Sequence, residues 1–464
     1  SVHARLGGIL GKRAPGDPLR VARHYAAAGM PREAALNYLQ SGRQALATSA
    51  LPEAIGALEL GLEQAAALTE SAFRDRAELD LRLALGTARM AQFGWPHESV
   101  PRALEPAFEL ARKLGDRRAL GPIFWGLWVH YQTCTDFGVA LEWLARLAAE
   151  LAEQDDAELA AVQDMSAGCQ YFWSAEYERA GAYTDHIRAN YDGRRHAGIV
   201  AYANHDPLCF SLHWAGTFLE WITGYPERAL HSLEQAVALA RSLGHPFNTA
   251  FTLTAGCHPL LLLGDPERML RHCDEVEALA HSEGLGPFSL NVQVAQWRGM
   301  ALIASGRFAE GYESTKTGND FWTQAGGRVC SALFWSWMAL GLGGMGRSEA
   351  ALALIDRALA HCRDTGDRYM EPEVLRIRAD LLGRRDDTMP GVIENTLRES
   401  IAVAQAHKAR SWELRSALDL ARLLQLQDRR DEGYQCLTPV YEWFNEGFES
   451  PDLVEAERLL GQLG

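Results

Sequence analysis

The chain has 464 residues, 47% of them hydrophobic, and its 60 acidic and 45 basic residues give a net charge of −15. The length exceeds what one ordinary globular core holds, and the apolar content excludes a disordered chain. The acidic balance and the lack of a Lys/Arg-rich tract argue against nucleic acid or an anionic membrane as partner, and no apolar run of ~18 residues predicts a membrane span.

Eight cysteines are scattered along the chain without a CxxC spacing. Most stand within apolar helical patterns, which is typical of free thiols in a reducing compartment. No signal peptide is visible at the start, so we expect a cytoplasmic protein. Ser1 stands where an initiator methionine is expected, and this indicates a processed or excised segment of a protein that extends upstream.

Residues 1–17 are predicted to be a junction before the first repeat. Within them, Gly7-Gly8-Ile9-Leu10-Gly11-Lys12-Arg13 places a lysine after a glycine, as phosphate-binding loops do. The four residues that such a loop needs between its glycines are missing, and Arg13 stands where Ser or Thr is required. We therefore expect no nucleotide site here and no cofactor in this chain.

Residues 18–189 carry the periodicity of amphipathic helices arranged in tetratricopeptide-like pairs. Short turns separate the helices, for example at Gly29, at Gly94-Trp95-Pro96 and around Ala175. After a first helix that ends at Gly29 and a second that opens at Pro31, helices are predicted at residues 51–68, 72–92, 98–114, 117–133, 137–153, 157–174 and 176–190.

The regular spacing fails at residues 190–206, which we predict to be an inserted loop. Asp206 is a suitable N-cap and Pro207 a suitable first helical residue, so a structural role is expected at its end. Loops that interrupt a regular scaffold often carry binding residues, so the alternative is a binding site in the loop. Its candidate residues are Tyr191, Arg194, Arg195, His196, His205 and Asp206.

Residues 207–366 hold the clearest repeat. The stretch Gly224-Tyr225-Pro226-Glu227-Arg228 recurs in altered form from Gly264, Gly306 and Gly346, at spacings of 40, 42 and 40 residues. Glycine ends a helix in the left-handed conformation, and proline suits the first residue of the next helix. A second glycine series runs in step at Gly244, Gly284, Gly326 and Gly366. Two breaks per period predict two helices per repeat.

Residues 367–464 are predicted to continue with C-terminal pairs, at residues 369–383 with 390–407 and at 411–425 with 430–444. The turns of these pairs are Arg384-Arg385-Asp386-Asp387 and Gln427-Asp428-Arg429-Arg430, and a capping helix follows at residues 451–462. The whole pattern predicts an all-α fold, an α-solenoid wound as a right-handed superhelix. It contains about ten tetratricopeptide-like helical pairs with long repeats of ~40 residues.

Small residues recur where the two helices of such a pair cross closely. Seven positions before each turn glycine stand Thr217, Cys257, Gly299 and Ala339. Five and twelve positions after it stand Ala229 and Ala236, Met269 and Val276, Gly311 and Gly318, and Ala351 and Ala358. Three of the four repeats fit this pattern cleanly, and the second repeat is bulkier.

Four stretches resemble a known group of proteins. They are Ala22-Arg23-His24-Tyr25-Ala26-Ala27-Ala28-Gly29, the loop residues 191–196 with 205–207, residues 370–378 with their Glu-x-x-x-x-Arg-x-Arg spacing, and residues 437–448. In these stretches the chain resembles the C-terminal helical-repeat region of bacterial multidomain signalling proteins, in which an adenylate or guanylate cyclase domain precedes a STAND-type AAA ATPase. Gly193 and Leu208 depart from the proline and glycine that are usual in that group. The resemblance implies a signal-transduction module without catalytic residues of its own.

The predicted first helices of the pairs are rich in aromatic residues. Such helices line the concave face of a solenoid, where an aromatic groove can hold a peptide or an apolar ligand. The alternative is that these rings form the core between repeats. The candidate groove residues are Trp125, Trp128, Tyr131, Tyr171, Trp173, Trp214, Trp297 and Trp335.

Two further patterns are candidates for a metal site and for a catalytic cluster. His205, Cys209 and His213 lie four residues apart and could bind zinc, but three ligands along one helix span ~12 Å and cannot meet one ion. Glu373 and Arg376 are expected to form an intrahelical ion pair rather than a catalytic cluster. We expect no metal site and no catalytic residue, so the chain is not expected to be an enzyme.

The sequence therefore predicts a non-catalytic module that recognises a protein, peptide or small ligand in its concave groove and controls an upstream ATPase or nucleotide cyclase. Self-association is left open. The first alternative is a free-standing scaffold that joins protein partners. A metal-binding or enzymatic repeat protein is the second alternative.

Overall fold

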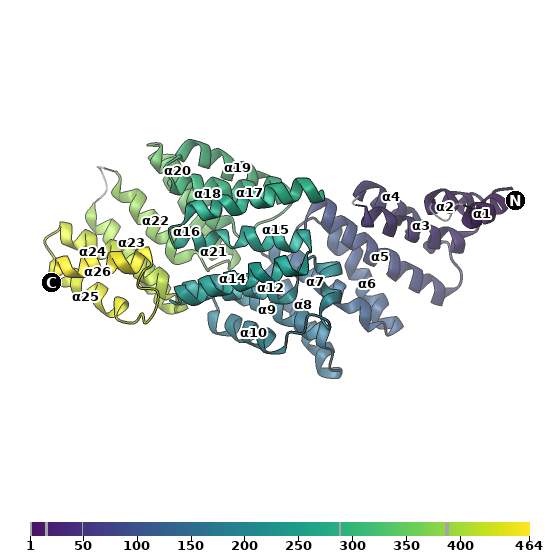
Figure 1. Ribbon diagram of the computed structural model, residues 1–464, viewed down its shortest axis with the longest axis horizontal. Coiled ribbons are helices and arrows are strands. Elements are labelled where there is room, and N and C mark those ends of the chain that lie inside the picture. Colours follow the sequence, from purple (N-terminus) through teal and green to yellow (C-terminus); the bar gives the residue numbers. More distant parts are fainter. Residues whose placement is uncertain (1, 14–16, 49, 287–288, 386–388) are drawn as a thin grey trace.

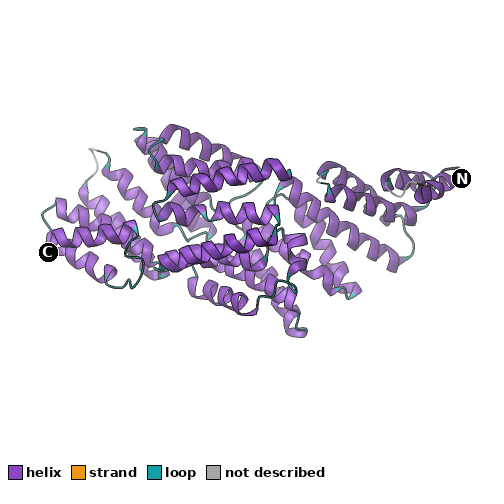
Figure 2. Ribbon diagram, viewed as in Figure 1, coloured by secondary structure: helices purple, strands orange, loops and turns teal. Residues whose placement is uncertain are grey.

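The computed structural model describes residues 2–13, 17–48, 50–286, 289–385 and 389–464. Helices make up all the regular secondary structure of these residues (Figures 1 and 2). The molecule is an α-solenoid, as the sequence predicts. The N-terminal helices extend as an arm from a coil that the later pairs form (Figure 1).

The helices of the arm are α1(Val2–Arg13), α2(Pro18–Ala27), α3(Pro31–Ala47), α4(Leu51–Ala66), α5(Ser71–Phe93) and α6(Ser99–Leu114). The coil begins with η1(Arg117–Ala119), α7(Leu120–Thr133), α8(Phe137–Glu153), α9(Ala157–Trp173), α10(Tyr177–Asn190) and α11(Ala197–Ala203). It continues with α12(Pro207–Ser211), η2(Leu212–Phe218), α13(Leu219–Ile222), α14(Pro226–Leu243), α15(Pro246–Ala255), α16(Cys257–Leu262) and α17(Pro266–Glu283). The remaining helices are η3(Ser289–Val294), α18(Ala295–Ala304), α19(Phe308–Gln324), α20(Ser331–Gly344), α21(Ser348–Thr365), α22(Glu371–Gly383), α23(Pro390–His407), α24(Arg410–Leu426), α25(Arg430–Tyr441) and α26(Pro451–Leu463).

The repeated glycines end helices in the way the sequence predicts. All eight adopt a positive φ, between 64° at Gly244 and 100° at Gly224. Helices α14 and α17 begin at Pro226 and Pro266, as expected of proline in the first helical position. Where a turn has no glycine, another residue takes the left-handed conformation, as Ala175 does at φ 60°. The local turn chemistry therefore sets the helix boundaries.

The small residues lie where the helices of a pair cross. Cys257, Gly299 and Ala339 are buried, and Cys257 and Gly299 face the second helix of their own pair. The closest crossing joins α18 to α19. A Cβ atom added to Gly299 would lie 2.5 Å from the backbone nitrogen of Thr315 and 2.7 Å from the carbonyl oxygen of Gly311. Only glycine permits this separation of the two backbones.

The coil closes on itself, so that successive superhelical turns touch along a seam. The seam joins the C-terminal end of one first helix to the start of the first helix five pairs further on. The carbonyl oxygen of Thr133 accepts hydrogen bonds from the backbone N–H groups of Arg328 (2.8 Å) and Val329 (3.1 Å). In the same way the Trp173 carbonyl accepts from the Arg368 N–H at 2.9 Å.

The seam continues into the C-terminal pairs. The Ser411 hydroxyl donates to the carbonyl oxygen of Trp221 across a separation of 190 residues. Beyond it, Glu446 accepts hydrogen bonds from the backbone N–H groups of Glu227 and Arg228, both at 3.1 Å. The concave side of the solenoid is therefore the interior of a closed coil, and aromatic side chains fill much of it.

The first helices of three consecutive pairs are irregular. The middle of the first is the π-helix η2, and the third begins with the π-helix η3. Between them, α15 and α16 are separated by a break at Gly256. The corresponding helices on the other side of the coil, α7, α9 and α20, are continuous. π-Helical segments in proteins are frequent at functional sites, so this irregularity directs attention to the interior beside these helices.

Candidate functional site

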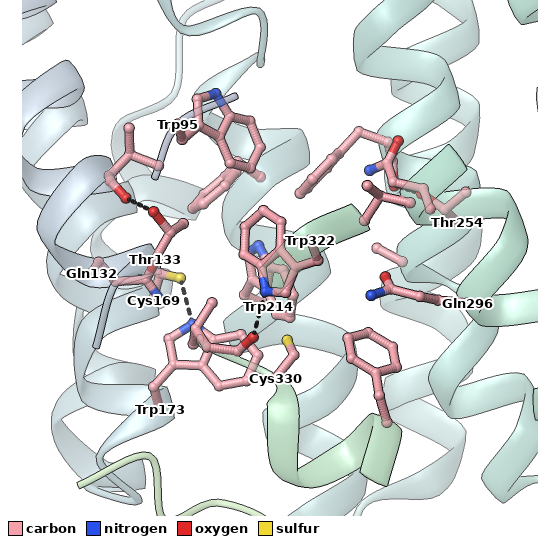
Figure 3. Close-up of a pocket in the computed structure, with 18 of the residues that line it drawn as sticks. Trp95, Gln132, Thr133, Cys169, Trp173, Trp214, Thr254, Gln296, Trp322 and Cys330 are labelled. Atoms are coloured by element: carbon pink, nitrogen blue, oxygen red, sulfur yellow. Dashed lines mark hydrogen bonds between the residues drawn. The ribbon is translucent and has the colours of Figure 1, made fainter. Parts of the chain in front are cut away.

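A cavity lies inside the coil, between the two superhelical turns (Figure 3). The first turn contributes α7 and α9, and the second contributes α19, α20 and the segment between them. The irregular first helices and the turn between α5 and α6 supply the rest of the wall. Six tryptophans and three phenylalanines line it: Trp95, Trp128, Trp173, Trp214, Trp297, Trp322, Phe210, Phe251 and Phe334. Smaller residues complete the wall: Val129, Gln132, Thr133, Cys169, Thr254, Ala255, Val292, Gln293, Gln296, Val329 and Cys330.

The cavity has room for a small organic group. Its cavity volume is ≈ 90 Å³, and the whole hollow, including space shared with solvent, has an empty volume of ≈ 670 Å³. For comparison, an engineered apolar cavity of about 150 Å³ holds benzene. The cavity volume of ≈ 90 Å³ is smaller than that, so a single ring or a short chain would lie partly in the outer hollow.

The predicted groove residues fall into two groups. Trp128, Trp173, Trp214 and Trp297 line the cavity. Trp125 is fully buried behind it, with its ring centroid 5.4 Å from that of Trp128. The cavity therefore joins aromatic residues from α7, α9, η2 and α18.

The other three predicted groove residues lie away from this cavity. The Tyr131 hydroxyl donates to Glu105 at 2.5 Å. Tyr171 lies under the guanidinium of Arg179, at 3.7 Å from the ring centroid. Trp335 lines a separate hollow beside Arg357, which covers its ring at 4.0 Å.

Most polar groups on the cavity wall have partners within the protein. The indole N–H of Trp173 donates to the Cys169 sulfur at 3.2 Å, and that of Trp322 donates to the Val329 carbonyl at 3.1 Å (Figure 3). Three buried atoms on the wall have no hydrogen-bond partner: Trp128 Nε1, Gln293 Oε1 and Gln296 Nε2. The wall thus keeps three polar atoms available in an otherwise apolar interior.

Three buried histidines surround the cavity wall. His205 packs against Phe251 in a tilted arrangement at a centroid distance of 4.3 Å, His213 packs on Trp214 at 4.4 Å, and His258 packs on Phe218 at 4.7 Å. Burial lowers the pKa of His205 to about 3 and that of His258 to about 3, and it lowers the pKa of His213 well below its ordinary value. The interior of the coil therefore disfavours a positive charge.

The predicted inserted loop contains a tight turn and the short helix α11. Asp206 caps α12 as expected, because its Oδ1 accepts from the N–H groups of Leu208 and Cys209, both at 3.0 Å. The other carboxylate oxygen accepts from the Tyr191 hydroxyl at 2.7 Å. His196 lies against Tyr191 with their ring centroids 5.7 Å apart. These three side chains hold the loop on the body of the coil.

The remaining loop candidates point in opposite directions. Arg194 and Arg195 are exposed, and their backbone N–H groups donate to the Asp192 carboxylate at 2.8 and 3.2 Å. His205 instead reaches the aromatic wall of the cavity. The six loop candidates therefore do not form one cluster, and a binding role for them stays a prediction.

The structure also places the two other patterns, the His/Cys pattern at residues 205–213 and the Glu373–Arg376 pair. Among the described residues, no group of three or more His, Cys, Asp or Glu side chains is placed to hold a metal ion. The expected Glu373–Arg376 pair is present and bidentate, with two contacts of 2.8 Å, and Arg376 also donates to Asp419 at 2.7 Å. Of the predicted turn at residues 384–387, Asp386 and Asp387 lie outside the described residues.

Several residues of the cavity were not predicted from the sequence. Trp95 belongs to the turn after α5, Trp322 to a second helix of a pair, and Gln293 and Gln296 to the irregular third repeat. A glutamine within a helical pattern carries no signal of its own. Phe210 had one available signal, since it stands on a first helix four residues before the predicted Trp214.

The similarities of this chain to known proteins cover most of its length. No family model matches it. It is similar to an uncharacterized protein of Rhizobium meliloti (strain 1021), with 24% identity over 401 residues that cover 85% of this chain and 38% of the relative. The chain thus spans well under half the length of this relative.

Among solved structures, the chain is similar to a Rap protein complexed with competence and sporulation factor (TM-score 0.38, 11% identity, 93% of this chain and 100% of that chain). It is also similar to the Cut9–Hcn1 assembly (TM-score 0.38, 10% identity, 99% and 92%). A third is a STAND signal transduction ATPase with a tetratricopeptide repeat sensor from Pyrococcus horikoshii (TM-score 0.36, 10% identity, 88% and 65%). All three TM-scores are below 0.5, so these similarities add nothing on function.

A helix that spans a bilayer must be long and apolar. None of the helices in the described ranges is long and apolar enough to cross a membrane.

Proposed function

We propose that this chain is a sensor module that binds a small ligand in the cavity of its closed coil. The observation that carries the proposal is the position of the cavity between two superhelical turns, beside three irregular first helices. A solenoid is stabilised by the regular stacking of its helical pairs and does not need irregular first helices. Concave, mostly apolar pockets with a few polar groups are the usual form of small-molecule sites.

A ligand in this cavity would act on the seam. Thr133 and Val329 line the cavity, and they are joined across the seam by a hydrogen bond between their backbones. A ligand that contacts both turns stabilises the closed coil over any opened form, by the difference in its affinity for the two. Ligand occupancy therefore changes how firmly the two turns are held together.

We further propose that this closure is relayed to an effector domain of a longer protein, an ATPase or nucleotide cyclase. The resemblance of four sequence stretches to such signalling proteins supports the relay. The R. meliloti relative, of which the chain spans 38%, leaves ample length for further domains.

The test uses toluene, a ligand with a single aromatic ring, as the probe. Toluene is expected to raise the melting temperature of the chain by several degrees, because a ligand that binds only the folded state stabilises it. It is also expected to slow hydrogen exchange at the backbone N–H groups of Arg328 and Val329, which form the seam.

Two variants that fill the cavity, Ala255→Phe and Val292→Phe, are expected to keep the helical circular dichroism signal and to lose the toluene shift. Val139→Phe on the exposed face of α8 is the matched control and should keep the shift. Binding that is unchanged in both filled variants would place the ligand elsewhere and would overturn the proposal.

A second candidate function is a scaffold for protein partners, and one observation favours it. Helix α1 leaves Val2, Leu6 and Ile9 exposed by 74%, 38% and 48%. These residues follow the spacing of one helical face, so the end of the arm presents an apolar stripe. A change of all three residues to Ser would abolish protein capture if the scaffold function holds, and it would leave toluene binding unchanged.

A further inference from the structure

We infer that the ligand group held in this cavity is a neutral aromatic ring bearing an amide-like donor and acceptor. This inference rests on the proposed function, because it specifies the ligand of the same cavity. The shape of the cavity, the unpartnered polar atoms of its wall and the charge of its surroundings each limit the chemical class of the ligand.

The wall selects for an aromatic ring. Nine aromatic side chains line the space, and they meet one another in tilted and edge-to-face arrangements, such as Trp173 with Trp214 at 4.7 Å. A ring inserted among them gains the same kind of contacts, which are worth about 0.5–1.5 kcal/mol per pair beyond the burial of area. The cavity volume of ≈ 90 Å³ is below the about 150 Å³ of a cavity that holds benzene, so no more than one ring fits, and part of it would lie in the outer hollow.

The unpartnered atoms call for a hydrogen-bonding group on that ring. Gln293 and Gln296 are 6% and 3% exposed, and both line the cavity. The Gln296 amide points into the space (Figure 3). Gln293 Oε1 accepts, Gln296 Nε2 donates, and a buried polar atom without a partner costs about 1–3 kcal/mol. A ligand with one donor and one acceptor would satisfy both atoms.

The backbone places the two amides on the same side. Gln293 belongs to η3 and Gln296 to the first turn of α18, so they are three residues apart on one helical face. The π-helical turn therefore occurs at the point where the chain presents this donor–acceptor pair. Trp128 Nε1, from the opposite turn of the coil, is a third polar atom without a partner.

The charge of the surroundings excludes an ionic ligand. An aromatic cage of this kind could bind a quaternary ammonium group through its ring faces. The described residues of the wall contain no carboxylate that would compensate a buried cation, and no Lys or Arg that would compensate an anion. The nearby His213 and His258 are held neutral by burial, so a cation entering the same interior meets the same penalty.

The experiment compares four probes that share one ring: toluene, benzamide, benzoate and phenyltrimethylammonium. Binding is followed by quenching of tryptophan fluorescence and by the shift of the melting temperature. We expect benzamide to bind at least tenfold more tightly than toluene, and we expect neither ion to bind.

The variant Gln296→Leu keeps the volume of the side chain and removes its amide. It is expected to lower the affinity for benzamide about tenfold and to leave that for toluene unchanged. The matched control Gln235→Leu changes an exposed glutamine on α14 and should behave as the wild type.

The outcomes separate the two proposals. If toluene binds and benzamide binds no more tightly, the cavity is a ligand site but the inferred class is wrong. Preferential binding of phenyltrimethylammonium or benzoate would overturn the neutral class in the same way. If none of the four probes binds, both the inference and the proposed function are wrong.

Discussion

The carbonyl oxygen of Thr133 accepts the backbone N–H of Arg328, 2.8 Å away, although the two residues belong to pairs five repeats apart. Thr133 is the last residue of α7, where helical carbonyl groups have no partner within the helix. The seam thus uses the free ends of helices to join two superhelical turns. It narrows the groove to a cavity that still opens to solvent.

The first prediction concerns the carboxylate that caps a helix across the seam. Glu446 accepts from the N–H groups of Glu227 and Arg228 at the start of α14, so it acts as an N-cap from a distant part of the chain. Glu446→Ala is expected to cost about 1 kcal/mol in urea unfolding, as cap removal usually does. Glu449→Ala, an exposed change nearby, serves as the control and should cost almost nothing. Equal stability of the two variants would mean that this contact does not hold the seam.

The second prediction concerns the closest helix crossing. Gly299→Ala places a Cβ atom against the backbone of α19, which cannot move without separating the pair. We expect a loss of about 2 kcal/mol or more, because overpacking of a backbone contact forces the helices apart. Gly461→Ala in α26 is the matched control, since a Cβ atom there meets nothing within 4 Å. It should be neutral or stabilising by up to about 1 kcal/mol, and thermal unfolding distinguishes the two.

The third prediction concerns the loss of folding stability at acidic pH. His205 and His258 have pKa values lowered to about 3 by burial, so between pH 3 and 6.5 the unfolded chain binds more protons than the folded one. Their contribution to stability is therefore complete above pH 6.5 and is lost as the pH falls. At pH 5 each histidine is expected to cost about 2 kcal/mol relative to neutral pH.

The measurement is urea unfolding between pH 7 and 5. Glu394 and Glu455, whose pKa values hydrogen bonds from arginines lower to about 2, lose their contribution only below pH ~4.5. His258→Phe removes one titrating group and keeps the packing, so it should flatten the profile, whereas the surface change His231→Phe should not. A profile that stays as steep in His258→Phe contradicts the assignment.

The fourth prediction concerns a buried arginine. Arg376 joins Glu373 and Asp419 with contacts of 2.7 to 2.8 Å, and its side chain is 14% exposed. Arg376→Met removes the shared partner of two carboxylates in a mostly buried site. Glu373 then keeps its ion pair with Arg415 (3.3 Å), and Asp419 keeps its pair with Arg422 (2.8 Å). We expect a loss of about 2 kcal/mol, less than a fully unpaired buried charge costs. Arg307→Met at an exposed pair with Glu310 should change stability by less than about 1 kcal/mol. Similar losses in the two variants would show that burial does not matter at this site.

Part of the candidate site could be predicted from the sequence. Trp128, Trp173, Trp214 and Trp297 were expected on a concave face because they stand on first helices, and all four line the cavity. Gln293 and Gln296 could not be predicted, since glutamine is common on exposed helical faces. Their importance depends on burial and on the absence of a partner, which are properties of the packed coil.

The sequence by itself determined where most helices of the regular repeats begin and end. Gly224 and Pro226 define one turn, and the same chemistry recurs through the chain, because helix caps depend on a few neighbouring residues. The tertiary structure alone decided that the coil closes. Small rotations between successive pairs accumulate over five repeats before Thr133 meets Arg328, and no local pattern encodes their sum. The cavity exists only where the two turns meet.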